Sequence, residues 1–160
     1  MAQDIFLKIE GIEGESSDSN HANEIDVLSW NWLVTQDANM HSGSGGGAGK
    51  AQVSDLEFEH NVDSASPNLL KMALTGKHIS EAVLTVRKAG GEPLEYLKIT
   101  MNDIVVTRVS LSADTSDPQI RESIALSFAK VKQEYIVQNI LGGSRGAVTA
   151  GYDIKGNKEV

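Results

Sequence analysis

A glycine-rich run at residues 41–50, HSGSGGGAGK, has the residue types of a loop that binds a nucleotide phosphate. Such a loop needs Gly, four residues of any type, Gly-Lys and then Ser or Thr, because backbone N–H groups surround the phosphates and the hydroxyl binds Mg²⁺. Counting back from Gly49 and Lys50 places Ser44 at the first Gly position and Ala51 at the hydroxyl position. The residues that follow largely alternate apolar and polar side chains, which indicates a strand and not the helix that a phosphate loop opens. The pattern therefore does not predict a nucleotide site.

The histidines, serines and cysteines give no pattern for catalysis or metal binding. The histidines show no i, i+4 pair and no flanking carboxylate pattern of a metal site, which favours scattered surface or loop positions. The serines at Ser44 and Ser144 lie beside glycines but lack the G-x-S-x-G spacing of a nucleophile turn. With no cysteine, the chain has no thiolate ligand or Cys nucleophile. We therefore expect no enzyme, no cofactor and no metal site. The histidines are His21, His41, His60 and His78.

The Trp30-Asn31-Trp32 triplet has the residue types of a carbohydrate-stacking platform. Two tryptophans on one face of a strand are more often part of the core, because each ring buries a large apolar area. In a regular strand, Asn31 points away from both rings. The triplet therefore predicts either a sugar-binding surface or a core strand with one polar side chain on its outer face.

The composition bounds the architecture and the partners. At 160 residues the chain is long enough for one domain, residues 1–160, with a core of its own. Its net charge of −8 disfavours nucleic acid and anionic membranes as partners. The start of the chain lacks the basic and apolar regions of a cleaved signal peptide, and no segment approaches the roughly 20 apolar residues of a membrane span. We expect no membrane insertion.

Alternation of apolar and polar residues predicts a mostly β protein. Two of the expected strands are much longer than the usual ~5–6 residues, which indicates a sheet that curls into a barrel. The strand at 24–35 has apolar side chains on both faces and therefore is buried on both sides or contacts a partner. We predict a curled β-barrel of two sheets with one short α-helix. The expected strands are 4–10, 24–35, 52–60, 79–88, 94–112, 119–137 and a last short one around 152–155.

The helix is expected after Ser66-Pro67, where Ser supplies a cap and Pro suits the first turn. Gly76 ends it. Its apolar stripe is predicted to cover one patch of the sheet. The stripe consists of Leu69, Leu70, Ala73 and Leu74.

Short segments in a fixed order along nearly the whole chain carry a resemblance to a known family. They are FLKIEGIEGES (6–16), HANEIDVLSWNW (21–32), GGGAGK (45–50), SPNLL (66–70), GKHI (76–79), LTVRKAGGE (84–92), YLKI (96–99) and GYDIKGN (151–157). Together they resemble the haemolysin-coregulated protein (Hcp) family, whose members form the tube of bacterial type VI secretion systems. The chain departs from the family pattern at Leu33, at Tyr152 and in the loop 112–118.

The resemblance implies a single Hcp-like β-barrel domain over residues 1–160 that assembles into hexameric rings without catalytic activity. The rings stack into a tube, which a contractile sheath drives out of the cell, with small effector proteins in the lumen. It implies contacts with sheath, baseplate and spike proteins. It also implies a cytoplasmic location before firing and then secretion, or delivery into target cells, without a cleaved signal peptide.

The resemblance also implies a role for the glycine-rich loop, which in the family reaches towards a neighbouring ring. Glycine supplies conformational freedom for that reach. The implied ring-stacking residues are His41, Ser42, Gly43, Ser44, Gly45, Gly46, Gly47, Ala48, Gly49 and Lys50. The alternative is a hairpin connection without a partner.

Asn31 is the expected lumen contact for effectors if the Trp face is core, and the alternative is an Asn that faces water or a neighbouring subunit. For the whole chain, the alternative function is a monomeric β-barrel module that binds a carbohydrate or protein ligand.

Overall fold

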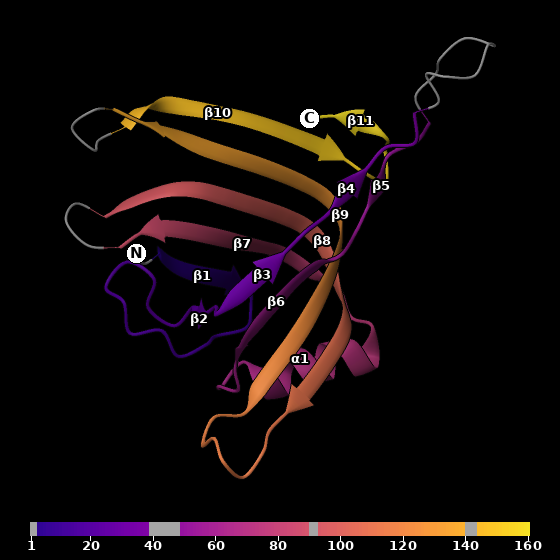
Figure 1. Cartoon of the computed structure of the whole chain (residues 1–160). Helices are drawn as coiled ribbons and strands as arrows, with labels where there is room; N and C mark the ends of the chain where they lie inside the picture. Colours follow the sequence, from indigo (N-terminus) through magenta and orange to yellow (C-terminus); the bar gives the residue numbers. More distant parts are fainter. Residues whose placement is uncertain (1–2, 39–48, 90–92, 140–143) are drawn as a thin grey trace.

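The computed structural model of the chain describes residues 3–38, 49–89, 93–139 and 144–160 (Figure 1). Within these ranges one helix, α1 (Ser66–Thr75), lies between β6 and β7. The strands are β1 (Gln3–Ile9), β2 (Ile25–Asp26), β3 (Ser29–Asn31), β4 (Val34–Thr35), β5 (Gln52–Val53), β6 (Leu56–Asn61), β7 (Ile79–Lys88), β8 (Leu94–Ser112), β9 (Arg121–Gln138), β10 (Ser144–Asp153) and β11 (Lys158–Glu159).

An antiparallel sheet of nine strands curls around the core, in the order β11-β10-β9-β8-β7-β1-β2, with β6 paired to both β9 and β3. The segment from β2 to β3 closes the curl. Val27 N donates to Ile5 O of β1 (2.9 Å), and the next residue, Leu28, donates from its N to Glu59 O of β6 (2.8 Å). Strands β4 and β5 form a second, two-stranded sheet. The predicted curled barrel of two sheets with one short helix is confirmed.

Strands β8 and β9 bend together where they leave the upper part of the sheet (Figure 1). Asp103 lies at the bend with a φ of 55°, a left-handed conformation that Asp adopts more readily than most residues. On either side of it Met101 and Ile104 are both fully buried, although residues three apart in a regular strand face opposite sides. On β9, Phe128 and Val131 show the same change of face. The bend therefore keeps the apolar face of both strands turned inward.

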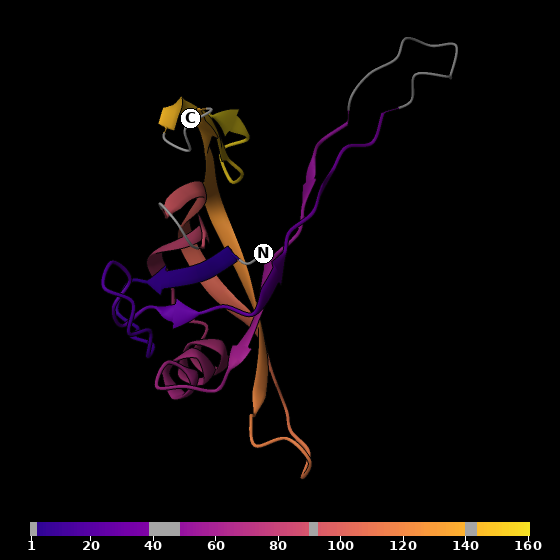
Figure 2. The ribbon, with the colours of Figure 1, turned by 60° about the vertical axis from the view of Figure 1, so that its left-hand side comes forward.

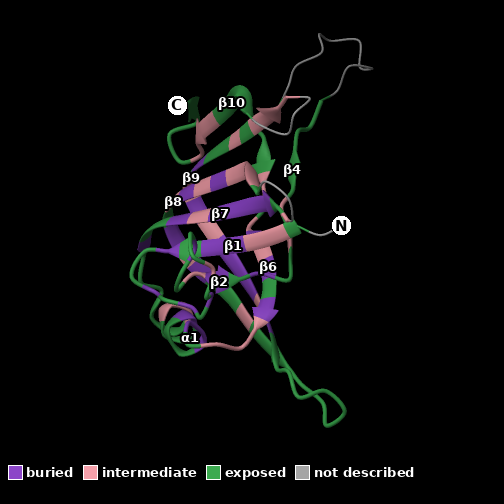
Figure 3. Cartoon of the chain, turned by 90° about the vertical axis from the view of Figure 1, so that its left-hand side faces the viewer, coloured by how far each residue is buried: buried purple, intermediate pink, exposed green. Residues whose placement is uncertain are grey.

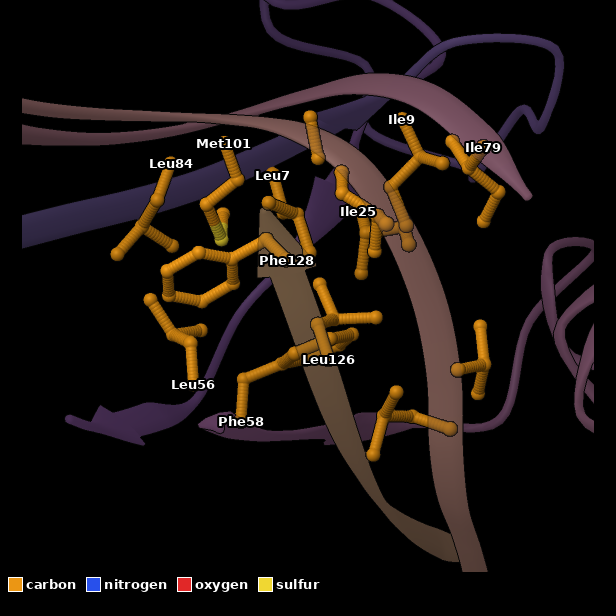
Figure 4. Close-up of a cluster of buried hydrophobic side chains, with 14 of the residues drawn as sticks. Leu7, Ile9, Ile25, Leu56, Phe58, Ile79, Leu84, Met101, Leu126 and Phe128 are labelled. Atoms are coloured by element: carbon orange, nitrogen blue, oxygen red, sulfur yellow. The ribbon is translucent and has the colours of Figure 1, made fainter. Parts of the chain in front are cut away.

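The core lies inside this curl (Figures 3 and 4). It joins side chains from strands far apart in sequence, including Leu7, Phe58, Leu84, Ile99 and Leu126, each at most 1% exposed. Burying one such side chain contributes about 1.5–3 kcal/mol. The core therefore holds β1, β6, β7, β8 and β9 together.

The helix confirms only part of its predicted apolar stripe. Leu69 is fully buried and Ala73 packs against the core, but Leu70 and Leu74 are 44% and 77% exposed. Met72 packs inward in their place. The side of the helix that contacts the core therefore carries Leu69, Met72 and Ala73, at positions i, i+3 and i+4.

The ends of α1 also differ from the prediction in one respect. Ala65, which is buried, holds the cap position, and Ser66 is the first helical residue. The Ser66 hydroxyl accepts a hydrogen bond from Asp63 N (3.1 Å), so it stabilises the preceding turn and does not cap the helix. Gly76 ends the helix as predicted, with a φ of 67°.

Three predicted strands have different bounds. Residues 52–60 form two strands, β5 and β6, which belong to different sheets. Residues 24–35 form three short strands and not one, because the chain passes from β1 to β6 at Val27 and Leu28 and then leaves the barrel. The short strand expected near 152–155 is the end of β10, which begins at Ser144. Its first seven residues are all exposed, so they carry no burial pattern.

In the described ranges no helix has the length and hydropathy to cross a membrane.

Candidate functional site

A two-stranded arm projects from the barrel (Figures 1 and 2). We define the arm as residues 33–38 and 49–54, which include β4 and β5. Val34 pairs with Val53 in this sheet, and Gly49 N donates to Asp37 O (2.8 Å) near its far end. Backbone hydrogen bonds therefore hold the arm together outside the core.

Trp32 anchors the root of the arm. Its Nε1 donates to Ser54 O (3.0 Å), while Leu33 N donates to the Ser54 hydroxyl (2.9 Å). The Trp32 ring lies against Phe128, with the ring centroids 5.9 Å apart. Trp30 also packs against the core, which confirms the core alternative for the tryptophan pair.

Of the predicted stacking loop, residues 41–50, the structure describes only Gly49 and Lys50, at the far end of the arm. His41, Ser42, Gly43, Ser44, Gly45, Gly46, Gly47 and Ala48 lie outside the described residues, and the role assigned to them stays a prediction. Gly49 and Lys50 are exposed. So are the arm side chains Leu33 and Val34, at 60% and 49%. The arm therefore exposes apolar side chains to solvent.

Asn31 lies on the outer surface of β3, as the alternation predicts. It pairs with Glu57 of β6, whereas the half-buried Trp30 pairs with Phe58 and packs against the core. A groove of about 300 Å³ runs beside Asn31, lined by Ser29, Trp30, Asn31, Glu57, Phe58, Glu59 and Ser123.

Charged and hydroxyl groups surround this groove. The Ser29 hydroxyl donates to the Glu59 carboxylate (3.0 Å). Arg108 Nη2 lies 3.3 Å from a Glu57 carboxylate oxygen and donates to the Ser123 hydroxyl (2.9 Å). These groups can hydrogen-bond a peptide surface. No group of His, Cys, Asp and Glu suited to a metal ion occurs in the part of the chain that the structure describes.

Two histidines expected at surface or loop positions are buried instead. His60 is fully buried and His21 is 7% exposed, whereas His78 is exposed. His60 continues the inward-facing series of Leu56 and Phe58 on β6, so the alternation of that strand could have predicted its burial. Burial opposes a charged imidazole, but the carboxylates of Asp63 and Glu122 outweigh it and raise the pKa of His60.

A second polar cluster holds the loop 10–24 against the sheet. Arg87 of β7 donates to Asp18 in that loop (2.7 and 2.9 Å) and to Asp4 of β1 (3.0 Å). The Arg87 hydrogen bond lowers the pKa of Asp18 to about 2. His21 of the same loop stacks on Phe6 of β1, with ring centroids 4.3 Å apart. Local sequence patterns do not reveal this cluster, because Arg87 is far along the chain from Asp4 and Asp18.

An apolar face of β9 and β10 extends beyond the core. Tyr135 pairs with Val148 across these strands, and the two side chains are 45% and 64% exposed. Val131 lies on the same face of β9, four residues before Tyr135, and is buried. The core face of the sheet therefore continues into a region where Val148 and Tyr135 stay exposed, with Tyr135 in edge contact with the Tyr96 ring.

These features define a β-rich structural module with a projecting arm. A sequence profile described as "Type VI secretion system effector, Hcp" matches residues 6–135. The chain is 44% identical over 159 residues to Protein hcp1 of Pseudomonas aeruginosa, covering 98% of each. It therefore belongs to the Hcp family of type VI secretion system proteins, a family of structural proteins and not of enzymes.

Solved structures show the same fold. Hcp1 from Salmonella typhimurium is 50% identical, with a TM-score of 0.81 and full coverage of both chains. A structure described as a type six secretion system protein is 26% identical, with a TM-score of 0.94 over 99% of this chain and 100% of that one. The expected family and fold are confirmed.

Proposed function

We propose that this chain is a structural subunit of the type VI secretion tube, forming hexameric rings that stack into a secreted tube. The observation that carries the proposal is the apolar face of β9 and β10 at Tyr135 and Val148. Monomeric soluble proteins rarely leave a sheet face of this kind uncovered next to their core. A neighbouring copy of the chain would cover it within a ring.

The arm supports the stacking of rings. It extends away from the barrel and displays Leu33 and Val34, which the barrel does not cover. A contact of this arm with the next ring would bury both side chains. Residues 41–50 are the proposed stacking residues.

The lumen of the tube would carry small effector proteins, with Asn31 as one contact. Its exposed position beside hydroxyl and carboxylate groups supports this role. Sheath, baseplate and spike proteins are the further proposed partners. The subunit would be cytoplasmic before firing and then outside the cell or inside a target cell.

The alternative is a monomeric β-barrel module that binds a carbohydrate or protein ligand. Its main support in the sequence is the tryptophan pair, and both rings are half-buried and pack against the core. Size-exclusion chromatography with light scattering, followed by negative-stain imaging, separates the two functions. We expect a hexamer with a central hole, and a stable monomer at micromolar concentration would refute the ring.

A further inference from the structure

The outer side of α1 is both apolar and basic. Leu70 and Leu74, one helical turn apart, are 44% and 77% exposed on the side turned away from the core. Lys71 and Lys77 are exposed beside them. The segment 66–78 contains no Asp or Glu, although the whole chain has a net charge of −8. The segment 66–78, which is α1 with the three residues that follow it, is therefore a local basic surface on an acidic protein.

The tip of the β8–β9 hairpin is apolar and acidic. It extends beyond the barrel at the end of the molecule where α1 lies (Figures 1 and 3). Leu111 and Ile120 are 56% and 44% exposed on it, and Asp114 and Asp117 are exposed between them. The segment 109–120 contains no Lys, Arg or His. The hairpin tip thus matches the outer side of α1 in apolar content and opposes it in charge.

Within one chain these two surfaces do not form ion pairs with each other. Among the described residues, neither Lys71 nor Lys77 is in an ion pair, and the carboxylates of Asp114 and Asp117 accept hydrogen bonds only from neighbouring loop residues. The inner side of α1 already packs against the core, so its outer side points away from this chain.

We propose that the hairpin tip of one copy docks on the outer side of α1 of a second copy. The leucines of the helix would meet Leu111 and Ile120, and the lysines would meet the two aspartates. Because the two surfaces differ, the contact is head-to-tail and can be repeated from copy to copy around a closed ring or along a filament. The existence of this contact rests on the proposed self-assembly. The hairpin tip and the outer side of α1 are the two surfaces that would carry that assembly.

A charge-swap experiment tests the contact by light scattering and sedimentation across protein concentrations. The helix variant carries Lys71→Glu and Lys77→Glu, the hairpin variant carries Asp114→Lys and Asp117→Lys, and the third combines all four. Each single-surface variant should weaken association about tenfold or more, and the combination should restore it. Lys8→Glu with Lys158→Glu is the matched control for net charge, and it should associate like the parent.

A second variant separates charge from loop structure. Asp114→Asn with Asp117→Asn keeps the side-chain oxygens that accept hydrogen bonds from Ser116 N (2.8 Å) and Gln119 N (2.9 Å). It should weaken association while leaving thermal stability unchanged. If the parent assembles and both charge-reversed variants assemble equally well, the contact is wrong and the ring proposal stands. A monomeric parent would refute both.

Discussion

The imidazole of His60 meets the carboxylate of Glu122 inside the barrel, with Nε2 and Oε1 2.7 Å apart and both side chains at most 1% exposed. The two residues lie directly opposite each other on β6 and β9. Asp63, in the turn before α1, lies 3.7 Å from the other ring nitrogen. One histidine therefore links two strands and the start of the helix.

This pair predicts a decrease in stability as pH rises. The folded-state pKa of His60 is raised above its ordinary value of 6.5, so the folded protein binds the proton more tightly than the unfolded chain. The stabilisation is fully present below about pH 6.5 and is lost as pH rises through the folded-state pKa. We expect the free energy of unfolding, measured with urea at a series of pH values, to fall over this window.

His60→Gln should remove that part of the pH dependence. At pH values below about 6.5, it should cost about 3–5 kcal/mol, because it leaves a buried carboxylate without its partner. The cost should shrink as pH rises. His78→Gln, at an exposed position, is the control and should keep the slope of the parent. An unchanged slope in His60→Gln would contradict the assignment.

Two leucines of α1 should differ in their contribution to stability. Leu69→Ala removes a fully buried side chain and should cost about 2–5 kcal/mol, through lost transfer free energy and the cavity that remains. Leu74→Ala, at 77% exposure on the same helix, should change stability by no more than about 0.5 kcal/mol. Urea unfolding of both variants measures the difference. Equal costs would mean that a different side of the helix is buried.

Arg87→Met should change the titration of Asp18. The hydrogen bond from Arg87 holds the pKa of Asp18 at about 2, below its ordinary value of 3.8. The associated stabilisation is present above the ordinary value and is lost as pH falls towards 2. In the variant, carboxyl NMR shifts should show the pKa of Asp18 rising towards 3.8. Arg108→Met is the control, since Arg108 contacts Glu57 and Ser123 and not Asp18.

Asn31→Arg tests the proposed lumen contact. Since Asn31 is exposed on β3, a bulky charged side chain should leave the ring size unchanged and should reduce effector retention. Light scattering measures the ring, and co-purification of a bound effector measures retention. Ser80→Arg, at another exposed strand position, should leave both unchanged. Loss of the ring in Asn31→Arg would show that this surface faces a subunit and not the lumen.

Shortening residues 43–49 tests the stacking role of the loop. The barrel and the Trp32 anchor lie outside the deleted stretch, so the hexamer should persist while tubes shorten. Electron microscopy of tube length and assays of secretion provide the measurement. Tube length and secretion equal to those of the parent would contradict the stacking role. Loss of hexamers would place the loop in the ring itself.

Local sequence determined where two of the long strands begin and end. Strand β7 has the predicted bounds, Ile79–Lys88, and β8 has the predicted bounds Leu94–Ser112. Period-two alternation fixes the face of each side chain relative to its neighbours, and turn residues fix where a strand stops. His60 follows the same rule, and its burial was predictable from Leu56 and Phe58.

Tertiary structure decided where strands change partners and what covers each face. Residues 24–35 alternate like one strand, but hydrogen bonds to β1 and then to β6 divide them. Alternation places Met101 and Ile104 on opposite faces, but the bend at Asp103 turns both inward. Leu70 and Leu69 are equally apolar, and only the direction from which the sheet approaches α1 buries one of them. These outcomes depend on contacts between residues far apart along the chain, which local periodicity does not contain.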